Sequence, residues 1–141
     1  MVEIAFARGA LTASEQAAVK EGFRVHGQEL GAPQYEKEQV KWIGVDGREE
    51  IRAILSAEIL WEWMYVDELW VSPESRGEGL GKRLILLAEE LAIAKGLQGV
   101  WLWTQSWQAV DFYAHLGFDE FARFDNFPQG HARVGFRKHL K

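Results

Sequence analysis

The segment from residue 64 to residue 95 constrains the fold most, because an apolar run, a glycine-rich loop and a helical pattern follow one another directly. Residues 64–71 are mostly apolar and predict a strand, which Pro73 ends because proline has no N–H to donate to a sheet. Leucine and alanine recur at helical spacing from residue 80 to about residue 95 and predict a helix. Between strand and helix lie three glycines in five positions, Gly77, Gly79 and Gly81. This order predicts a strand, a sharp turn and a helix of an α/β domain.

Glycines at the start of a helix suit the binding of an anion. The first N–H groups of a helix have no partner within it and carry partial positive charge, and glycines let an anion approach them without a Cβ in the way. The spacing is not G-x-G-x-x-G, and it is not a P-loop, because Gly81-Lys82 is followed by Arg83. The loop therefore indicates either another kind of anion site or a turn that binds nothing.

Periodicity predicts further elements on both sides of this segment. We expect strands at residues 2–8, 39–45, 50–60, 100–104, 120–127 and 132–139. We expect one helix from Thr12 or Ser14 to between residues 27 and 33, and another over residues 108–116. Asp46-Gly47 predicts a tight hairpin turn between the second and third of these strands.

Composition excludes several classes of protein. The 141 residues, 48% of them hydrophobic, predict a single domain over residues 1–141. The absence of cysteine excludes a thiol nucleophile and cysteine-ligated metals, and the four histidines show no metal-ligand spacing, so we expect no metal. A net charge of -5 disfavours nucleic acid. With no secretory signal and no apolar run of about 20 residues, we expect a cytoplasmic protein that does not enter a membrane.

The pattern Arg76-x-x-Gly79-x-Gly81, preceded by Val71-x-Pro73, closely resembles the pyrophosphate-binding motif of the GCN5-related N-acetyltransferases, the GNAT family. The resemblance implies an α/β (α+β) fold with a mixed, mostly antiparallel, splayed sheet of six to seven strands and helices on both faces. It implies that acetyl-CoA enters where the fourth and fifth strands part, and that the fourth strand carries a bulge. The backbone of that strand would meet pantetheine at Leu69, Trp70 and Val71. The pyrophosphate would lie against Arg76, Gly77, Glu78, Gly79, Leu80, Gly81 and Lys82.

A second motif lies about thirty residues downstream, Ala109-x-x-Phe112-Tyr113-x-x-x-Gly117-Phe118, and is similar to the family in the same order. The resemblance implies that Ala109, Phe112 and Tyr113 lie beside the coenzyme and that Tyr113 protonates the departing thiolate. Ser106 stands where many relatives have an asparagine that contacts the coenzyme, and a serine there could cap the helix or reach the coenzyme. The alternative for Tyr113 is an aromatic residue packed in the core.

Asp67 and Glu68 are the candidate bases, because an acidic residue near this place in relatives accepts the proton of the amine or orients it. Both lie just upstream of the implied bulge, and adjacent strand residues face opposite ways, so we expect only one to face the acceptor, with Asp67 the first choice. A backbone N–H near Val71 would polarise the carbonyl. Each carboxylate could instead be solvated or paired in a structural role.

These residues lead us to expect an acetyl-CoA-dependent N-acetyltransferase that acts on a primary amine of a small molecule or peptide. Attack would be direct, in a ternary complex, because no cysteine could carry the acetyl group. The alternatives are a non-catalytic acyl-CoA sensor and a turn without a ligand. The pairs Trp61/Trp63 and Trp101/Trp103 alternate on strands and belong either to the core or to the acceptor site. Exposed strand edges near the C-terminus would allow a homodimer.

Overall fold

The structure, a computed structural model, describes all residues from 1 to 141 and divides into two compact units, Met1–Tyr35 and Glu36–Lys141. The first unit holds one helix, α1 (Ala13–Glu29), which has no buried residue. Of the two predicted caps, Thr12 is the one that caps it: its hydroxyl accepts from the Glu15 N–H, and the Glu15 carboxylate accepts from the Thr12 N–H. The strand predicted at residues 2–8 is wrong, because this segment forms no strand. Alternating apolar residues make a strand only where another strand pairs with them, and this unit contains none.

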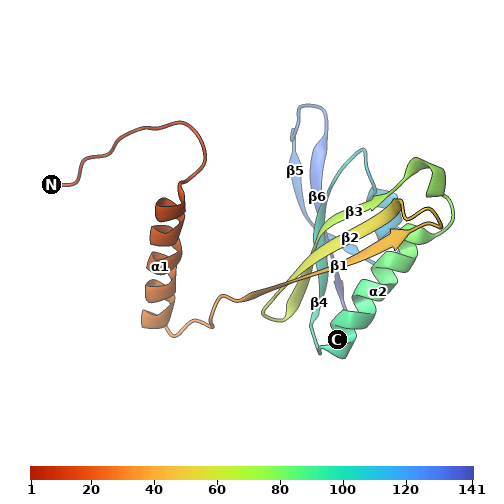
Figure 1. Cartoon of the computed structure of the whole chain (residues 1–141), viewed down its shortest axis with the longest axis horizontal. Coiled ribbons are helices and arrows are strands. Elements are labelled where there is room, and N and C mark those ends of the chain that lie inside the picture. The colour runs from red at the N-terminus through yellow and green to blue at the C-terminus, as the bar shows by residue number, and fades with distance from the viewer. The chain divides into compact units, whose positions relative to one another are not determined.

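The second unit is a six-stranded sheet with the strand order β1-β2-β3-β4-β6-β5 (Figure 1). Its strands are β1 (Lys37–Val45), β2 (Ile51–Leu60), β3 (Trp63–Val71), β4 (Gly99–Gln105), β5 (Asp119–Asp125) and β6 (Ala132–His139). Neighbouring strands are antiparallel except β3 and β4, which are parallel. The predicted mixed, mostly antiparallel sheet of six to seven strands is confirmed, with six.

The turn between β1 and β2 differs from the tight hairpin that Asp46-Gly47 predicts. Five residues connect the strands, and the Asp46 carboxylate organises them by accepting from the N–H groups of Arg48 and Glu50. Arg52 Nε donates to the same carboxylate at 2.8 Å, and these hydrogen bonds lower the pKa of Asp46. The left-handed residue is Glu49, with φ 61°. A side chain that accepts three hydrogen bonds thus outweighs the local preference of the Asp-Gly pair.

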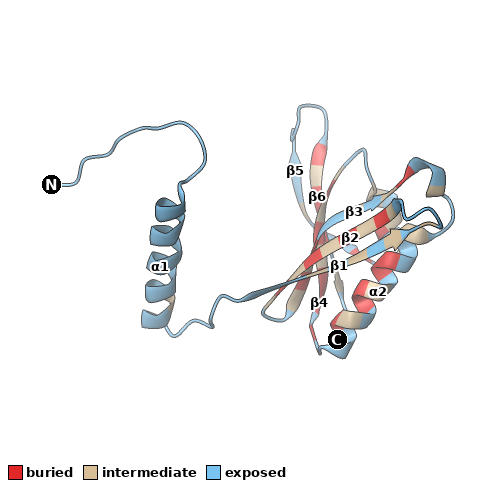
Figure 2. Ribbon diagram, in the orientation of Figure 1, coloured by how far each residue is buried: buried red, intermediate tan, exposed pale blue.

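The core lies between one face of the sheet and two helices, α2 (Leu80–Ala94) and α3 (Val110–His115). Buried residues alternate along β2, β4 and β6, and Figure 2 shows them in red on these strands and on the inner side of α2. Tyr113 of α3 joins this core against Phe136 of β6, their ring centroids 6.0 Å apart. We also expected helices on both faces of the sheet. A helix on the opposite face stays a prediction. No helix is long and apolar enough to cross a membrane.

Candidate active site

The sheet splays between its two parallel strands. β3 and β4 pair only over four residues each, ending with Val66 opposite Leu102. Beyond that point β3 runs on to Val71, paired with β2 alone, and β4 runs on to Gln105, paired with β6 alone. Two strand edges with free backbone groups therefore border the splay, and an extended ligand can pair with them. The parting of these strands is the feature that the family resemblance implied.

A bulge in β3 lies at Asp67. Ser56 of β2 is opposite Glu68, and the next residue, Ala57, is opposite Val66, so Asp67 is an extra residue without a partner. We expected the bulge after both predicted carboxylates. It lies instead at the first of them, Asp67. Register depends on contacts between strands, which the residues of one strand do not encode.

The bulge changes where the two candidate bases point. Val66 is buried on the helix face of the sheet, so Asp67, the next residue, points to the opposite face. Glu68 is opposite Ser56 and shares that residue's face, which is also the opposite one. The expectation that these two carboxylates point to opposite faces of the sheet is therefore wrong, because the extra residue puts both on one side.

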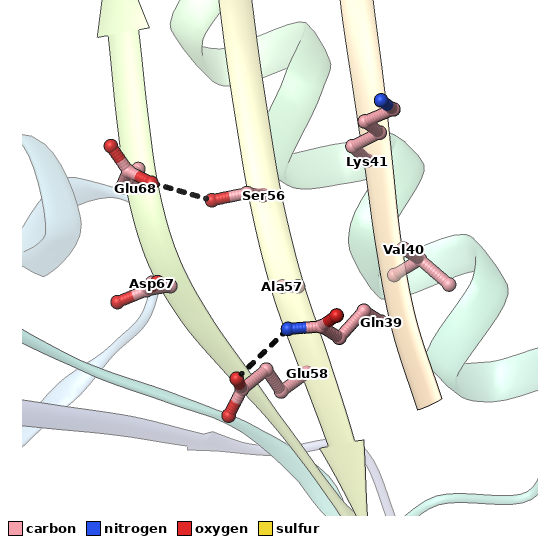
Figure 3. Close-up of a pocket in the computed structure, with 8 residues that line it drawn as sticks. All are labelled: Gln39, Val40, Lys41, Ser56, Ala57, Glu58, Asp67 and Glu68. Carbon is pink, nitrogen blue, oxygen red and sulfur yellow. Dashed lines mark hydrogen bonds between the residues drawn. The ribbon is translucent and has the colours of Figure 1, made fainter. Parts of the chain in front are cut away.

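Both carboxylates line a pocket of about 420 Å³ on this face, named here the carboxylate pocket (Figure 3). Its lining comes from β1, β2 and β3 and comprises Gln39, Val40, Lys41, Ser56, Ala57, Glu58, Asp67 and Glu68. The Ser56 hydroxyl donates to Glu68 Oε1 at 3.4 Å, and Gln39 donates to Glu58 Oε1 at 3.4 Å. Glu58 also pairs with Lys37 at 3.4 Å, whereas Asp67 and Glu68 are in no ion pair. The lining holds three carboxylates against one ammonium, that of Lys41, and this excess of negative charge favours a cation.

Aromatic side chains continue this face beside the pocket. The ring centroids of Tyr65 and Trp101 are 4.5 Å apart, and the Arg133 guanidinium lies 4.9 Å from the Trp103 ring centroid. Burial raises the pKa of Tyr65, and the negative charge of Asp67 raises it further. Trp101 and Trp103 are half-buried on this face and do not belong to the core on the helix face. For this pair, the alternative of a place in the core is therefore excluded.

The glycine loop, residues 76–82, follows a short 3-10 helix after β3, η1 (Pro73–Ser75), and includes the first three residues of α2. Gly77 and Gly79 have φ of 83° and 80°, a left-handed conformation that favours glycine, with open space where a Cβ would stand. Gly79 is the N-cap, and the first helical bond runs from the Arg83 N–H to its carbonyl at 3.0 Å. No side chain caps the helix, so its first amides are free for an anion. Arg76 Nε donates to the Val71 carbonyl at 3.1 Å and so braces the loop against β3.

Gly81 has a role that the sequence did not reveal. A Cβ on this residue would lie 3.3 Å from Phe112 Cζ and 3.9 Å from Val71 Cγ2. The end of β3, the start of α2 and the helix α3 therefore meet at one point, and the absence of a side chain allows it. The sequence alone attributes Gly81 to the approach of an anion, because a contact with a residue 31 positions away leaves no local signal.

Tyr113 is buried, with 6% of its surface exposed, and packs edge-on against Phe112 and Phe118. Burial raises the pKa of its hydroxyl to about 12, so the phenol keeps its proton at neutral pH. Its helix, α3, is shorter at both ends than the predicted helix over residues 108–116. Both alternatives for Tyr113 are compatible with this position, because the ring belongs to the core and the residue adjoins the contact at Gly81.

Ser106 does not cap α3, because the N-cap is Ala109, which offers no side-chain hydrogen bond. The Ser106 hydroxyl accepts from the Ala132 N–H at 2.9 Å, and its own N–H donates to the Ala132 carbonyl at 2.7 Å. These bonds hold the end of β4 to the start of β6. The O–H of Ser106 still has its proton to donate.

Comparison with known proteins identifies the family. A sequence model described as the Acetyltransferase (GNAT) family matches residues 10–118. The chain belongs to the GNAT family. The blasticidin-S acetyltransferase of Streptomyces morookaense is 38% identical over 84 residues, 59% of this chain and 62% of the relative. The match therefore spans less than two thirds of that relative's length.

Solved acetyltransferases support the GNAT fold. An acetyltransferase from Bacillus cereus superposes with a TM-score of 0.81 over 96% of this chain and 98% of its own, at 24% identity. An acetyltransferase from Bacillus anthracis, solved with acetyl coenzyme A, gives a TM-score of 0.66 over 73% of this chain and 63% of its own, at 23% identity. At these identities the likeness concerns the fold.

The residues of this GNAT chain fit an acyl-CoA co-substrate. The uncapped start of α2, with two left-handed glycines before it, suits a pyrophosphate. The unpaired edge of β3 suits the amide groups of a pantetheine arm. Both features are made by the backbone and lie on one continuous segment, from β3 through the glycine loop to α2.

Proposed function

We propose that this protein is an N-acetyltransferase that transfers the acetyl group of acetyl-CoA to a primary amine. The observation that carries the proposal is the arrangement around β3. Its free edge and the glycine loop offer a seat for an acyl-CoA, and its bulge turns two unpaired carboxylates into the carboxylate pocket. A donor seat and an amine-attracting pocket on one strand are what a direct transfer needs.

The coenzyme would lie along the glycine loop and the splay. The amides from Gly77 to Lys82, with Arg76, Glu78 and Leu80 in the same turn, would hold the pyrophosphate. The backbone of Leu69, Trp70 and Val71 would pair with pantetheine. Ser106, Ala109 and Phe112 would line the other side.

The reaction would form one C–N bond and break one C–S bond. Asp67 or Glu68, directly or through a water, would take a proton from the amine, which attacks only when neutral. A backbone N–H on the free edge of β3 would stabilise negative charge on the acetyl oxygen. The Tyr113 hydroxyl would give its proton to the sulfur as the thiolate leaves, and the second proton of the amine would restore the phenol through solvent.

The carboxylate pocket favours an acceptor that arrives as a cation, because two of its carboxylates have no cationic partner. Its volume of about 420 Å³ suits a small molecule or one side chain of a peptide. The relative named for blasticidin-S supports a small-molecule amine. The rings of Tyr65 and Trp101 beside the pocket would pack against an aromatic or cationic part of such an acceptor.

Incubation with acetyl-CoA and a panel of primary amines tests the proposal. We expect free coenzyme A to appear in step with one acetylated amine. Thiol titration measures the coenzyme A, and mass spectrometry detects the acetylated amine. The alternative, an acyl-CoA sensor, predicts calorimetric binding of acetyl-CoA without turnover of any amine. A chain that neither binds acetyl-CoA nor acetylates an amine contradicts both.

Two expectations about the cellular form belong to the same proposal. We infer a cytoplasmic protein. We also infer a homodimer, since β5, near the C-terminus, is an edge strand of the sheet and a strand of another chain could pair with it. Analytical ultracentrifugation of the full chain measures this directly. A single monomeric species at micromolar concentration contradicts the dimer.

A further inference from the structure

One lysine connects three elements of the core. Lys138 lies on β6, and its ammonium group is 2.5 Å from Glu89 Oε1 of α2. The same ammonium donates to the carbonyl of Leu116, the last turn of α3, at 2.8 Å. It also lies 5.9 Å from the ring centroid of Phe118, the second residue after Leu116. A single charged group therefore holds two helices to the last strand.

Stability alone does not explain the ion pair. The Glu89 side chain is only 7% exposed, and its second oxygen, Oε2, is buried without any hydrogen-bond partner. A buried carboxylate with one bare oxygen loses much of its solvation, and two apolar side chains of similar volume often stabilise a core equally well. What an apolar pair lacks is a donor for the Leu116 carbonyl.

The end of α3 depends on that donor. The helix has only six residues, and no side chain caps its beginning. At its end the chain turns through Gly117, with φ 88°, and a Cβ there would lie 3.5 Å from Lys138 Cε. The left-handed φ favours glycine at this position, and a Cβ would make only an ordinary contact with the lysine. The ammonium satisfies a carbonyl at the helix terminus, where a positive charge is favoured.

We propose that Lys138 is a positioning residue, which fixes α3 relative to α2 and thereby sets Tyr113 against the glycine loop. α3 carries both Tyr113 and Phe112, and Phe112 contacts Gly81 at the start of α2. A shift of α3 therefore moves the hydroxyl relative to the loop amides. The catalytic consequence rests on the proposed function, whereas the mechanical link stands independently of it.

The test replaces the ion pair by an apolar pair, Glu89→Leu with Lys138→Met. We expect the double variant to stay folded, because no charge is left unpaired. We expect the amides of residues 113–117 to exchange hydrogen about tenfold faster, since their helix has lost its bond to β6, while those of β4 stay unchanged. The kcat falls about tenfold to a hundredfold and acetyl-CoA affinity stays within about threefold, because a displaced catalytic group affects the reacting step most.

The matched control is Glu89→Gln, which removes the ion pair but keeps the lysine bond to Leu116. It retains wild-type exchange in α3 and wild-type kcat, even if the protein melts at a lower temperature. If the double variant does not fold, Glu89→Gln with Lys138→Met is measured in its place, because this pair also removes the lysine bond to Leu116 and leaves no buried charge.

Unchanged exchange in α3, or unchanged kcat in spite of faster exchange, overturns the proposal. Equal loss of kcat in the double variant and in Glu89→Gln also overturns it, because the carboxylate and not the lysine bond would then matter. If the wild-type protein acetylates no amine, the proposed function fails and hydrogen exchange alone decides whether Lys138 fixes α3.

Discussion

The glycine loop and the carboxylate pocket are near neighbours along the chain, yet they are built in opposite ways. The loop takes its shape from the backbone, through left-handed Gly77 and Gly79 and the uncapped start of α2. The pocket takes its character from side chains on three strands, brought together by one bulge. The loop therefore depends on backbone conformation, and the pocket on the identity of its side chains.

This contrast makes a strong prediction: changes in the loop alter the affinity for acetyl-CoA, and changes in the pocket alter the use of the amine. A variant that changes the affinity for acetyl-CoA and the kcat/KM for the amine equally would contradict this division between loop and pocket. The variants below are ordered from the largest expected effect to the smallest.

Tyr113 belongs to neither region and should show the largest effect. We expect Tyr113→Phe to lower kcat about a hundredfold, the loss typical of a general acid, with the affinity for acetyl-CoA unchanged. Rapid-quench measurement of the first turnover separates chemistry from product release. Tyr35→Phe, at an exposed tyrosine of the first unit, is the control and should retain full activity. An unchanged rate of chemistry in Tyr113→Phe removes the residue from its role.

The pH dependence sharpens the assignment of Tyr113. A phenol donates only while protonated, and burial raises the pKa of Tyr113 to about 12. The rate should therefore show no loss from tyrosine ionisation as the pH rises to about 11, one unit below that pKa. A loss of kcat centred near pH 10 that disappears in Tyr113→Phe contradicts the buried position of this hydroxyl.

The two carboxylates of the bulge come next. We expect Asp67→Asn or Glu68→Gln, whichever removes the base, to lower kcat/KM for the amine by about tenfold to a hundredfold. The remaining rate should rise with pH, because hydroxide or the free amine then replaces the lost base. Calorimetry with acetyl-CoA provides the control and should give the wild-type affinity. A loss of acetyl-CoA binding in either variant breaks the division between pocket and loop.

In the loop, Gly79→Ala should weaken the binding of acetyl-CoA about tenfold. An alanine at φ 80° costs about 1–2 kcal/mol, so the loop is expected to leave the conformation that presents its amides. The value of kcat at saturating acetyl-CoA should stay close to that of the wild type. Gly47→Ala, in the β1–β2 loop, is the matched control, since its φ is not left-handed and a Cβ there meets nothing within 4 Å. Equal weakening in both variants would point to a general loss of stability and not to the loop.

Glu58→Gln should have the smallest effect. This carboxylate lines the pocket but already pairs with Lys37 and accepts from Gln39. A partly exposed pair of this kind contributes little, so we expect KM for the amine to change by less than about threefold with kcat unchanged. A loss as large as that of the bulge variants would show that the acceptor lies nearer β2 than β3.

The sequence predicts best the features that depend on the local backbone, as the glycine loop does. The strand over residues 64–71, the glycines and the helix after them form one local segment, and the structure contains all three within one or two residues of their predicted bounds. Turn glycines and helical spacing are local signals, so they can be read from one chain.

What the sequence does not predict depends on partners distant in the chain. The bulge at Asp67 is fixed by the register against β2, and the role of Gly81 by contact with Phe112. The strand expected at residues 2–8 has the right alternation but no neighbouring strand in its unit. The loop at Asp46 shows the same limit at shorter range, because Arg52 and the backbone of Arg48 and Glu50 outweigh the turn preference.

A crystal structure of the full chain with acetyl-CoA tests the central claim most directly. The account predicts pyrophosphate oxygens on the amides of residues 77–82, pantetheine along the free edge of β3, and the thioester facing the side on which Asp67 and Glu68 lie. A coenzyme bound elsewhere on the sheet, or bound with its thioester directed away from both carboxylates, would contradict it.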